Sequence, residues 1–177
     1  MRGLADEQTI VEFMGEFGRS ARQRVCVYLT GGASAVLLGW RPSTLDVDLR
    51  FIPDEDALYR AIPALKERLH LNVEIAAPSD FIPELPGWEE RSRFITQVGK
   101  ADFYHYDFYA QALAKIERGH VQDVHDVTSM LEHGLVEPAE LLHLFACIEP
   151  RLYRYPAIDP PRFRAAVEAV AGNPPPA

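Results

Sequence analysis

Two carboxylates one residue apart stand in an otherwise apolar segment, Leu45-Asp46-Val47-Asp48-Leu49. In a strand, alternate side chains point to the same face and each residue advances ~3.3 Å. Asp46 and Asp48 would then share one face, while Leu45, Val47 and Leu49 point into a core. Carboxylates placed in this way can hold two divalent metal ions ~3.5–4 Å apart, the arrangement used for phosphoryl and nucleotidyl displacement. The alternative is a solvated polar sheet face, although strand interiors disfavour Asp.

A glycine pair lies upstream of the two carboxylates, in Thr30-Gly31-Gly32-Ala33-Ser34. It follows the apolar segment 25–29 and precedes a short apolar helix, 33–38. Glycine permits a positive φ and lets backbone amides approach a phosphate closely. The sequence therefore suggests Gly31, Gly32 and the Ser34 hydroxyl as nucleotide ligands. A tight strand-to-helix turn without a ligand is the alternative.

The order of these motifs, Gly-Gly-x-Ala and then Arg-x-x-Thr-x-Asp-x-Asp, resembles the nucleotidyltransferase superfamily, the fold of polymerase beta and the aminoglycoside adenylyltransferases. The gap from Gly31 to Asp46 is longer than in the minimal antitoxin members. It is similar to the branch of the abortive-infection type II toxins and related uncharacterised bacterial proteins. The similar region runs from about residue 25 to about residue 131. The resemblance implies that Arg41 faces a triphosphate and that Thr44 bonds to the backbone of the metal site; a surface arginine and a turn threonine are the alternatives.

Glu74 lies in the middle of a third predicted strand, 72–76, between apolar Val73 and Ile75. The resemblance implies that a carboxylate here completes a metal triad with Asp46 and Asp48 and helps to deprotonate the attacking hydroxyl. A general base must lie within hydrogen-bond reach of that hydroxyl. The family usually has Asp at this position, so the extra methylene of Glu shifts the carboxylate. A solvated glutamate on an edge strand is the alternative.

A second polar group lies further along the chain, where Lys115 precedes Asp123 and Asp126. The resemblance implies that Lys115 contacts the triphosphate or the acceptor. Asp123 and Asp126 are three residues apart, so they lie on one helix face and could orient the lysine or the attacking group. The alternative is a surface lysine followed by acids that stabilise a helix N-terminus.

Composition places the chain among ordinary globular proteins. Its 177 residues are 47% hydrophobic and carry a formal net charge of −8. An acidic chain does not bind nucleic acid through bulk electrostatics, which rely on Lys and Arg. The two cysteines, Cys26 and Cys147, are expected to be buried free thiols in a reducing cytoplasm. The polar N-terminus and the lack of a ~20-residue apolar run favour a cytoplasmic location.

The periodicity predicts an α/β (α+β) fold: a small mixed sheet flanked by helices, then a helical C-terminal bundle. Strands are expected at 25–29, 45–51, 72–76, 94–98 and 101–106. Helices are expected at 7–17, 33–38, about 107–119, 121–132, 138–148 and 161–170, with another after Pro53. The predicted organisation is a nucleotidyltransferase-like core at 1–106, a helical subdomain at 107–172 and a disordered tail at 173–177.

Three functions are compatible with this sequence. The leading hypothesis is a nucleotidyltransferase using two Mg²⁺ ions, which moves a nucleoside monophosphate from a nucleoside triphosphate to a hydroxyl of unknown identity. The resemblance adds a setting in toxin–antitoxin or phage-defence systems. The second is a catalytically weak or inactive member of the fold that binds a partner protein or acts as an antitoxin. The third is transfer of the γ-phosphate by the same site.

Overall fold

The computed structural model describes residues 3–172. It shows a mixed α+β fold, as predicted, and the chain divides into two compact units. The first, which we call the sheet unit, contains the chain up to Ala77 and Ser92–Tyr106. The second, the helical unit, contains Pro78–Arg91 and the chain from Asp107 onward. The disordered tail predicted at 173–177 lies outside the described residues.

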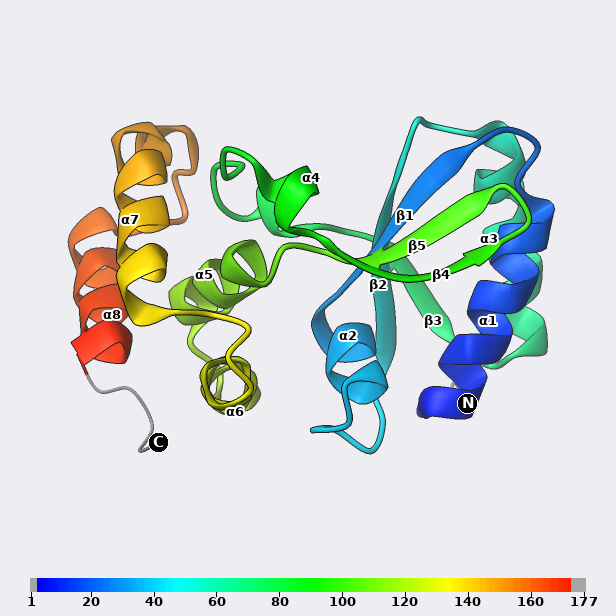
Figure 1. The fold of residues 1–177 in the computed structure, drawn as a ribbon, viewed down its shortest axis with the longest axis horizontal. Helices are drawn as coiled ribbons and strands as arrows, with labels where there is room; N and C mark the ends of the chain where they lie inside the picture. The colour runs from blue at the N-terminus through cyan, green and yellow to red at the C-terminus, as the bar shows by residue number, and fades with distance from the viewer. Residues whose placement is uncertain (1–2, 173–177) are drawn as a thin grey trace. The chain divides into compact units, whose positions relative to one another are not determined.

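The sheet unit contains a five-stranded sheet in the order β3-β2-β1-β5-β4 (Figure 1). Its strands are β1 (Val25–Thr30), β2 (Asp46–Ile52), β3 (Asn72–Ile75), β4 (Arg93–Val98) and β5 (Ala101–His105). The pairs β1–β2 and β4–β5 are antiparallel, whereas β1–β5 and β2–β3 are parallel. All five predicted strands are present, with small shifts at their ends.

Three helices complete the core of this unit: α1 (Glu7–Ser20), α2 (Gly31–Leu37) and α3 (Asp56–Arg68). The apolar stripe of α1 includes Ile10, Phe13 and Phe17, all fully buried. It packs with α3 and with Val47 and Leu49, which alternate with the carboxylates along β2. Since β2 buries every second residue, the alternation that was read from the sequence is confirmed.

Leu45 and the two cysteines differ from expectation. Leu45 is 64% exposed, because β2 begins one residue later and Leu45 lies in the preceding turn. Cys26 and Cys147 are free, as predicted, but Cys26 is half-buried and Cys147 is exposed. Cys26 alternates with buried Val25 and Val27, so it points to the opposite, polar face of the sheet.

Helix α3 begins within the acidic run 54–56, but no side chain of this run makes a cap hydrogen bond. The Glu55 side chain is buried instead and accepts the backbone N–H of Arg22 at 2.5 Å. This acid therefore joins the end of α1 to the start of α3.

The helical unit begins with the segment 78–91, which holds the short turn η1 (Pro78–Asp80) and α4 (Trp88–Arg91). It continues with α5 (Phe108–Arg118), α6 (Val121–Glu132), α7 (Pro138–Ile148), η2 (Glu149–Arg154) and α8 (Pro160–Gly172). Segment 78–91 was predicted to belong to the α/β core at 1–106. In the structure it groups with the helices, since Arg91 is paired with the fully buried Asp107 at 2.7 Å and Tyr155 donates to the Ser79 carbonyl.

The turns between these helices follow local rules. The Asp107 carboxylate caps α5 by accepting the N–H of Tyr109 at 3.1 Å. Burial raises the pKa of Asp107, and the Arg91 guanidinium acts against this effect. Gly119 ends α5 in the left-handed conformation, with φ of 70°.

Two glycines of α1 offer a matched test of this packing. A Cβ on Gly18 would lie 2.7 Å from the Val98 Cβ and 2.9 Å from its carbonyl oxygen, whereas one on Gly15 meets only the flexible Arg19 side chain at 3.5 Å. We expect Gly18→Ala to lower the free energy of unfolding by about 1–3 kcal/mol through overpacking. Gly15→Ala should raise it by about 0.5–1 kcal/mol through helix propensity. Urea unfolding of both variants measures this, and equal effects would contradict the close approach of α1 to β4.

Candidate functional site

The carboxylates of β2 and β3 lie on one face of the sheet. The strand register aligns Asp48 with Thr30 of β1 on one side and with Glu74 of β3 on the other. Asp46 precedes this row by two residues and therefore points to the same face. We call this face, with Thr30, Asp46, Asp48, Asn72 and Glu74, the acidic face. The three acids that the sequence singled out are thus brought together by strand pairing.

An asparagine lies between two of these acids. The Asn72 side-chain amide donates to the Asp46 carboxylate at 2.6 Å and to the Glu74 carboxylate at 2.9 Å. One nitrogen thus carries hydrogen bonds to two like-charged groups and offsets part of their repulsion. Asn72 was not among the residues predicted from the sequence to belong to the site. Its i, i+2 spacing from Glu74 was the signal that both would share a face.

The glycine turn lies against the acidic face. Gly31 follows β1 directly and has a φ of 61°. A Cβ at this residue would lie 3.0 Å from Asp48 Oδ2. A side chain here would therefore be strained and would crowd the carboxylate, so glycine is required by both conformation and space.

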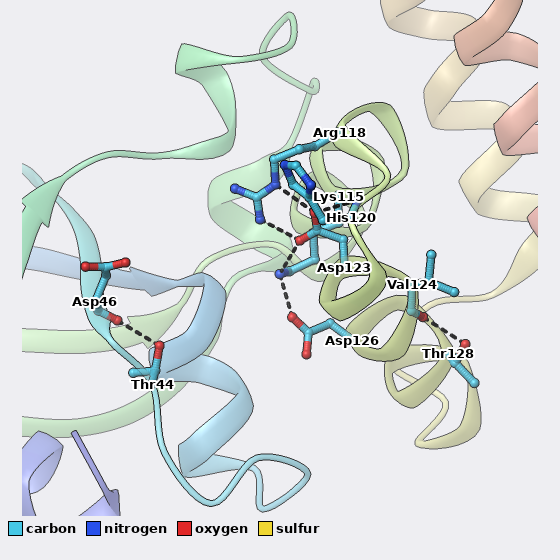
Figure 2. A network of polar contacts seen from close by, with 9 residues as sticks. All are labelled: Thr44, Asp46, Lys115, Arg118, His120, Asp123, Val124, Asp126 and Thr128. Atoms are coloured by element: carbon cyan, nitrogen blue, oxygen red, sulfur yellow. Dashed lines mark hydrogen bonds and ion pairs between the residues drawn. The ribbon is translucent and has the colours of Figure 1, made fainter. Parts of the chain in front are cut away.

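Gly32 is required by a second close approach. A Cβ there would lie 2.0 Å from Thr44 Oγ1 and 3.4 Å from Arg41 Nη1. The buried Thr44 hydroxyl donates to the Asp46 carbonyl at 3.2 Å (Figure 2). The backbone N–H of Thr44 donates to the Ala5 carbonyl, and the Thr44 carbonyl accepts the backbone N–H of Ala5. Thr44 therefore fixes the start of β2 beside the glycine turn, and Arg41 lies over the same turn.

Ser34, which the sequence suggested as a nucleotide ligand, is fully buried, and its hydroxyl donates to the Leu29 carbonyl at 3.2 Å. That hydroxyl also lies within hydrogen-bond distance of His105 Nδ1, at 3.0 Å. Ser34 thus holds α2 against the ends of β1 and β5, and its role as a nucleotide ligand stays a prediction.

His105, at the end of β5, is a buried neutral imidazole. Burial, with a contribution from Arg93, lowers its pKa from 6.5 to about 4. No spacing signal in the sequence could have identified this contact, since 71 residues separate His105 from Ser34.

A second polar cluster occupies the helical unit. Lys115 Nζ is paired with Asp126 at 2.6 Å and with Asp123 at 3.4 Å, and all three side chains are at least 93% buried (Figure 2). Arg118 adds two hydrogen bonds to Asp123, at 2.7 and 2.5 Å. Burial alone would raise the pKa of Asp123, but Arg118 and Lys115 lower it overall. The cluster joins α5 to the first turns of α6, where Asp123 also accepts the His120 backbone N–H at 3.3 Å.

The acids differ in what they offer a cation. Those of the acidic face are partly or fully exposed, while the buried Asp123 and Asp126 are paired with the buried Lys115, and Asp123 also with the exposed Arg118. Within residues 3–172, no group of three or more His, Cys, Asp or Glu side chains is arranged as a ready-made metal cage. The same residues include no helix long and apolar enough to cross a membrane.

The mixed sheet, its row of acids and the glycine turn define the class of this fold as nucleotidyltransferase-like. A family model described as "Nucleotidyltransferase of unknown function (DUF6036)" matches residues 8–153, and the chain belongs to this family. Comparisons with curated proteins and with solved structures gave no match. The match covers both the acidic face and the Lys115 cluster.

The buried imidazole predicts a pH dependence of stability. Its pKa is about 4 when folded and 6.5 when unfolded, so between these values the unfolded chain binds more protons and stability falls as the pH falls. From pH 8 to pH 5 this amounts to about 2 kcal/mol. His105→Asn keeps a donor toward Ser34 but does not titrate. Urea unfolding at both pH values should show a smaller loss for the variant than for the wild type, and equal losses would contradict the assignment.

The Lys115 cluster predicts strong coupling between its members. Lys115→Met leaves the fully buried Asp126 without its ammonium partner, which should cost about 3–5 kcal/mol. Lys115→Met combined with Asp126→Leu should recover much of that loss, because both charges are then removed. Double-mutant-cycle analysis of urea unfolding measures the coupling, and additive effects would show that the pair does not stabilise the helical unit.

Proposed function

We propose that this protein is a magnesium-dependent nucleotidyltransferase, which moves a nucleoside monophosphate from a nucleoside triphosphate to a hydroxyl acceptor. The observation that carries the proposal is that Gly31 lies directly against the carboxylate of Asp48, which is in one row with Thr30 and Glu74. It places a glycine turn, suited to phosphate, against carboxylates suited to a divalent cation. The family description supports the general class.

The acidic face fits Mg²⁺ in donor chemistry. Its ligands would be the carboxylates of Asp46, Asp48 and Glu74, since hard oxygen donors are those that Mg²⁺ prefers. Two of these carboxylates share one hydrogen-bond donor, the neutral amide of Asn72, which can release a carboxylate to a cation at small cost. When bound, the ions would neutralise charge on the attacking and leaving oxygens.

The chain's own groups have separate tasks in this proposal. The amides of Gly31 and Gly32 and the Arg41 guanidinium bind the triphosphate. Thr44 holds the Asp46 backbone in place. Glu74 accepts the proton of the acceptor hydroxyl, a task for which its exposed carboxylate is accessible. The hydroxyl oxygen then attacks the α-phosphorus, and pyrophosphate leaves. Lys115 acts through the stability of the helical unit, since its ammonium is engaged by two carboxylates.

Calorimetric titration with each of the four ribonucleoside triphosphates, with and without Mg²⁺, tests this proposal. We expect magnesium-dependent binding that Asp48→Asn weakens at least about tenfold, since each lost carboxylate contact to the bound cation is worth more than ~1.4 kcal/mol.

Asp46→Asn should abolish turnover and leave the melting temperature unchanged or slightly higher, because like charges on one face repel. Asp54→Asn, at an exposed acid outside the acidic face, is the control. A fully active Asp46→Asn variant would overturn the proposal.

A second function is favoured by two specific observations: the glutamate at position 74 and the Asn72 amide between two acids. Both suit a protein that kept the fold but lost efficient catalysis and instead binds a partner, as an antitoxin does. Its signature is a stable complex with the product of a neighbouring gene that Asp46→Asn leaves intact.

Comparing transfer from α- and γ-labelled nucleotides separates nucleotidyl transfer from γ-phosphate transfer.

A further inference from the structure

The helical unit contains a groove that the proposed function does not use. Helices α6 and α8 both pack on α5 and leave between them a pocket of about 440 Å³. This volume lies within the range of about 300–1,000 Å³ typical of small-molecule sites. All of its lining residues belong to the helical unit, so the pocket is complete within one compact unit.

The walls of the groove are formed by one face of α6 and one face of α8. From α6 come Val124, Val127, Thr128 and Leu131, and from α8 come Ala166, Ala169 and Val170. These spacings of three, four and seven residues place each set on one face of its helix. Val124 is 60% exposed, an unusual fraction for an apolar side chain in a concave site. The groove therefore presents small apolar side chains to solvent, and the small residues of α8 keep it wide.

One cationic side chain at this groove makes no pair with any other residue of the described range. The Arg162 guanidinium lines the pocket, and among residues 3–172 it makes no hydrogen bond or ion pair. Asp159 lies nearby, but its carboxylate accepts the Arg162 backbone N–H at 3.2 Å at the start of α8. Glu117 lines a narrow cavity beside the same arginine without pairing with it.

The two other charged residues of the lining are already neutralised. Lys115 is paired with two aspartates, and Asp123 with Lys115 and Arg118. The one unpaired charge among the described lining residues is therefore the positive charge of the Arg162 guanidinium.

We propose that this groove binds a small amphiphilic anion, an apolar chain or ring with a single carboxylate. The apolar part would lie between α6 and α8, and the carboxylate would pair with Arg162, whose planar fork suits that group. A neutral apolar molecule would use the same walls without the arginine. Because the groove lies wholly within the helical unit, the proposal does not depend on the acidic face.

The first experiment compares decanoate with decanol, which share an apolar chain but differ in charge. Ligand-observed NMR and thermal shift on the full chain should show decanoate binding more tightly than decanol. Ala169→Trp fills the groove from an exposed position and should abolish binding of both. Ala165→Trp introduces the same side chain at an exposed residue of α8 outside the pocket, and it should leave binding unchanged.

The second experiment isolates the charge. Arg162→Gln should weaken decanoate about threefold to tenfold, as expected for a partly solvated charged hydrogen bond, and leave decanol unchanged. Arg164→Gln removes an exposed arginine of the same helix that is paired with Glu149 and does not line the groove, so it serves as the matched control.

Three results of the ligand-binding experiments would overturn the proposal: no binding of either molecule, equal loss with Ala165→Trp and Ala169→Trp, or equal loss of decanoate with both arginine variants. A change in sedimentation with Ala169→Trp, without any ligand binding, would also overturn it, since the groove would then be an interface between copies of this chain. None of these results depends on nucleotide binding, so they leave the nucleotidyltransferase proposal untouched.

Discussion

The central constraint on this structure is the register of three strands. Because β2 pairs with β1 on one side and with β3 on the other, Thr30, Asp48 and Glu74 fall into one row. Asp46, two residues before Asp48, lies on the same face. A shift of one residue in either pairing would turn these carboxylates into the apolar core. The buried partners Val47 and Leu49, fully inaccessible to solvent, therefore fix the position of the acids as firmly as they stabilise the core.

Gathering like charges on one face requires compensation, and the two units achieve it in different ways. On the acidic face, Asn72 supplies a neutral donor to two carboxylates that remain accessible. In the helical unit, Lys115 and Arg118 supply full positive charges to carboxylates removed from water. An amide can release a carboxylate to a cation at small cost, whereas a buried ion pair loses several kcal/mol when one partner is lost. The acidic face is accordingly suited to exchange partners, and the Lys115 cluster is suited to hold helices together.

The features that depend on residues close together in the chain were predictable from the sequence. Alternation along β2 predicted the shared face of Asp46 and Asp48, and the adjoining glycines predicted a strand-to-helix turn. The contacts that could not be predicted join residues distant in the chain, such as Ser34 with His105 and Arg91 with Asp107. Residue type alone did not reveal the contacts of Ser34, because a hydroxyl near a helix start is as able to bond to a strand carbonyl as to a phosphate. Segment 78–91 fell within the predicted core at 1–106, but only tertiary contacts decide which unit such a segment joins.

The glycine turn shows how such a site constrains the backbone itself. Gly31 needs a positive φ and free space beside Asp48, and Gly32 needs space beneath Thr44. Any Cβ at either position would push on the residues that set the carboxylates, since Thr44 holds the Asp46 carbonyl. A turn required only to connect β1 to α2 could satisfy the positive φ with one glycine. Here Gly31 approaches Asp48, and Gly32 approaches Thr44, which holds the start of β2, so the turn and the carboxylates form one geometric unit.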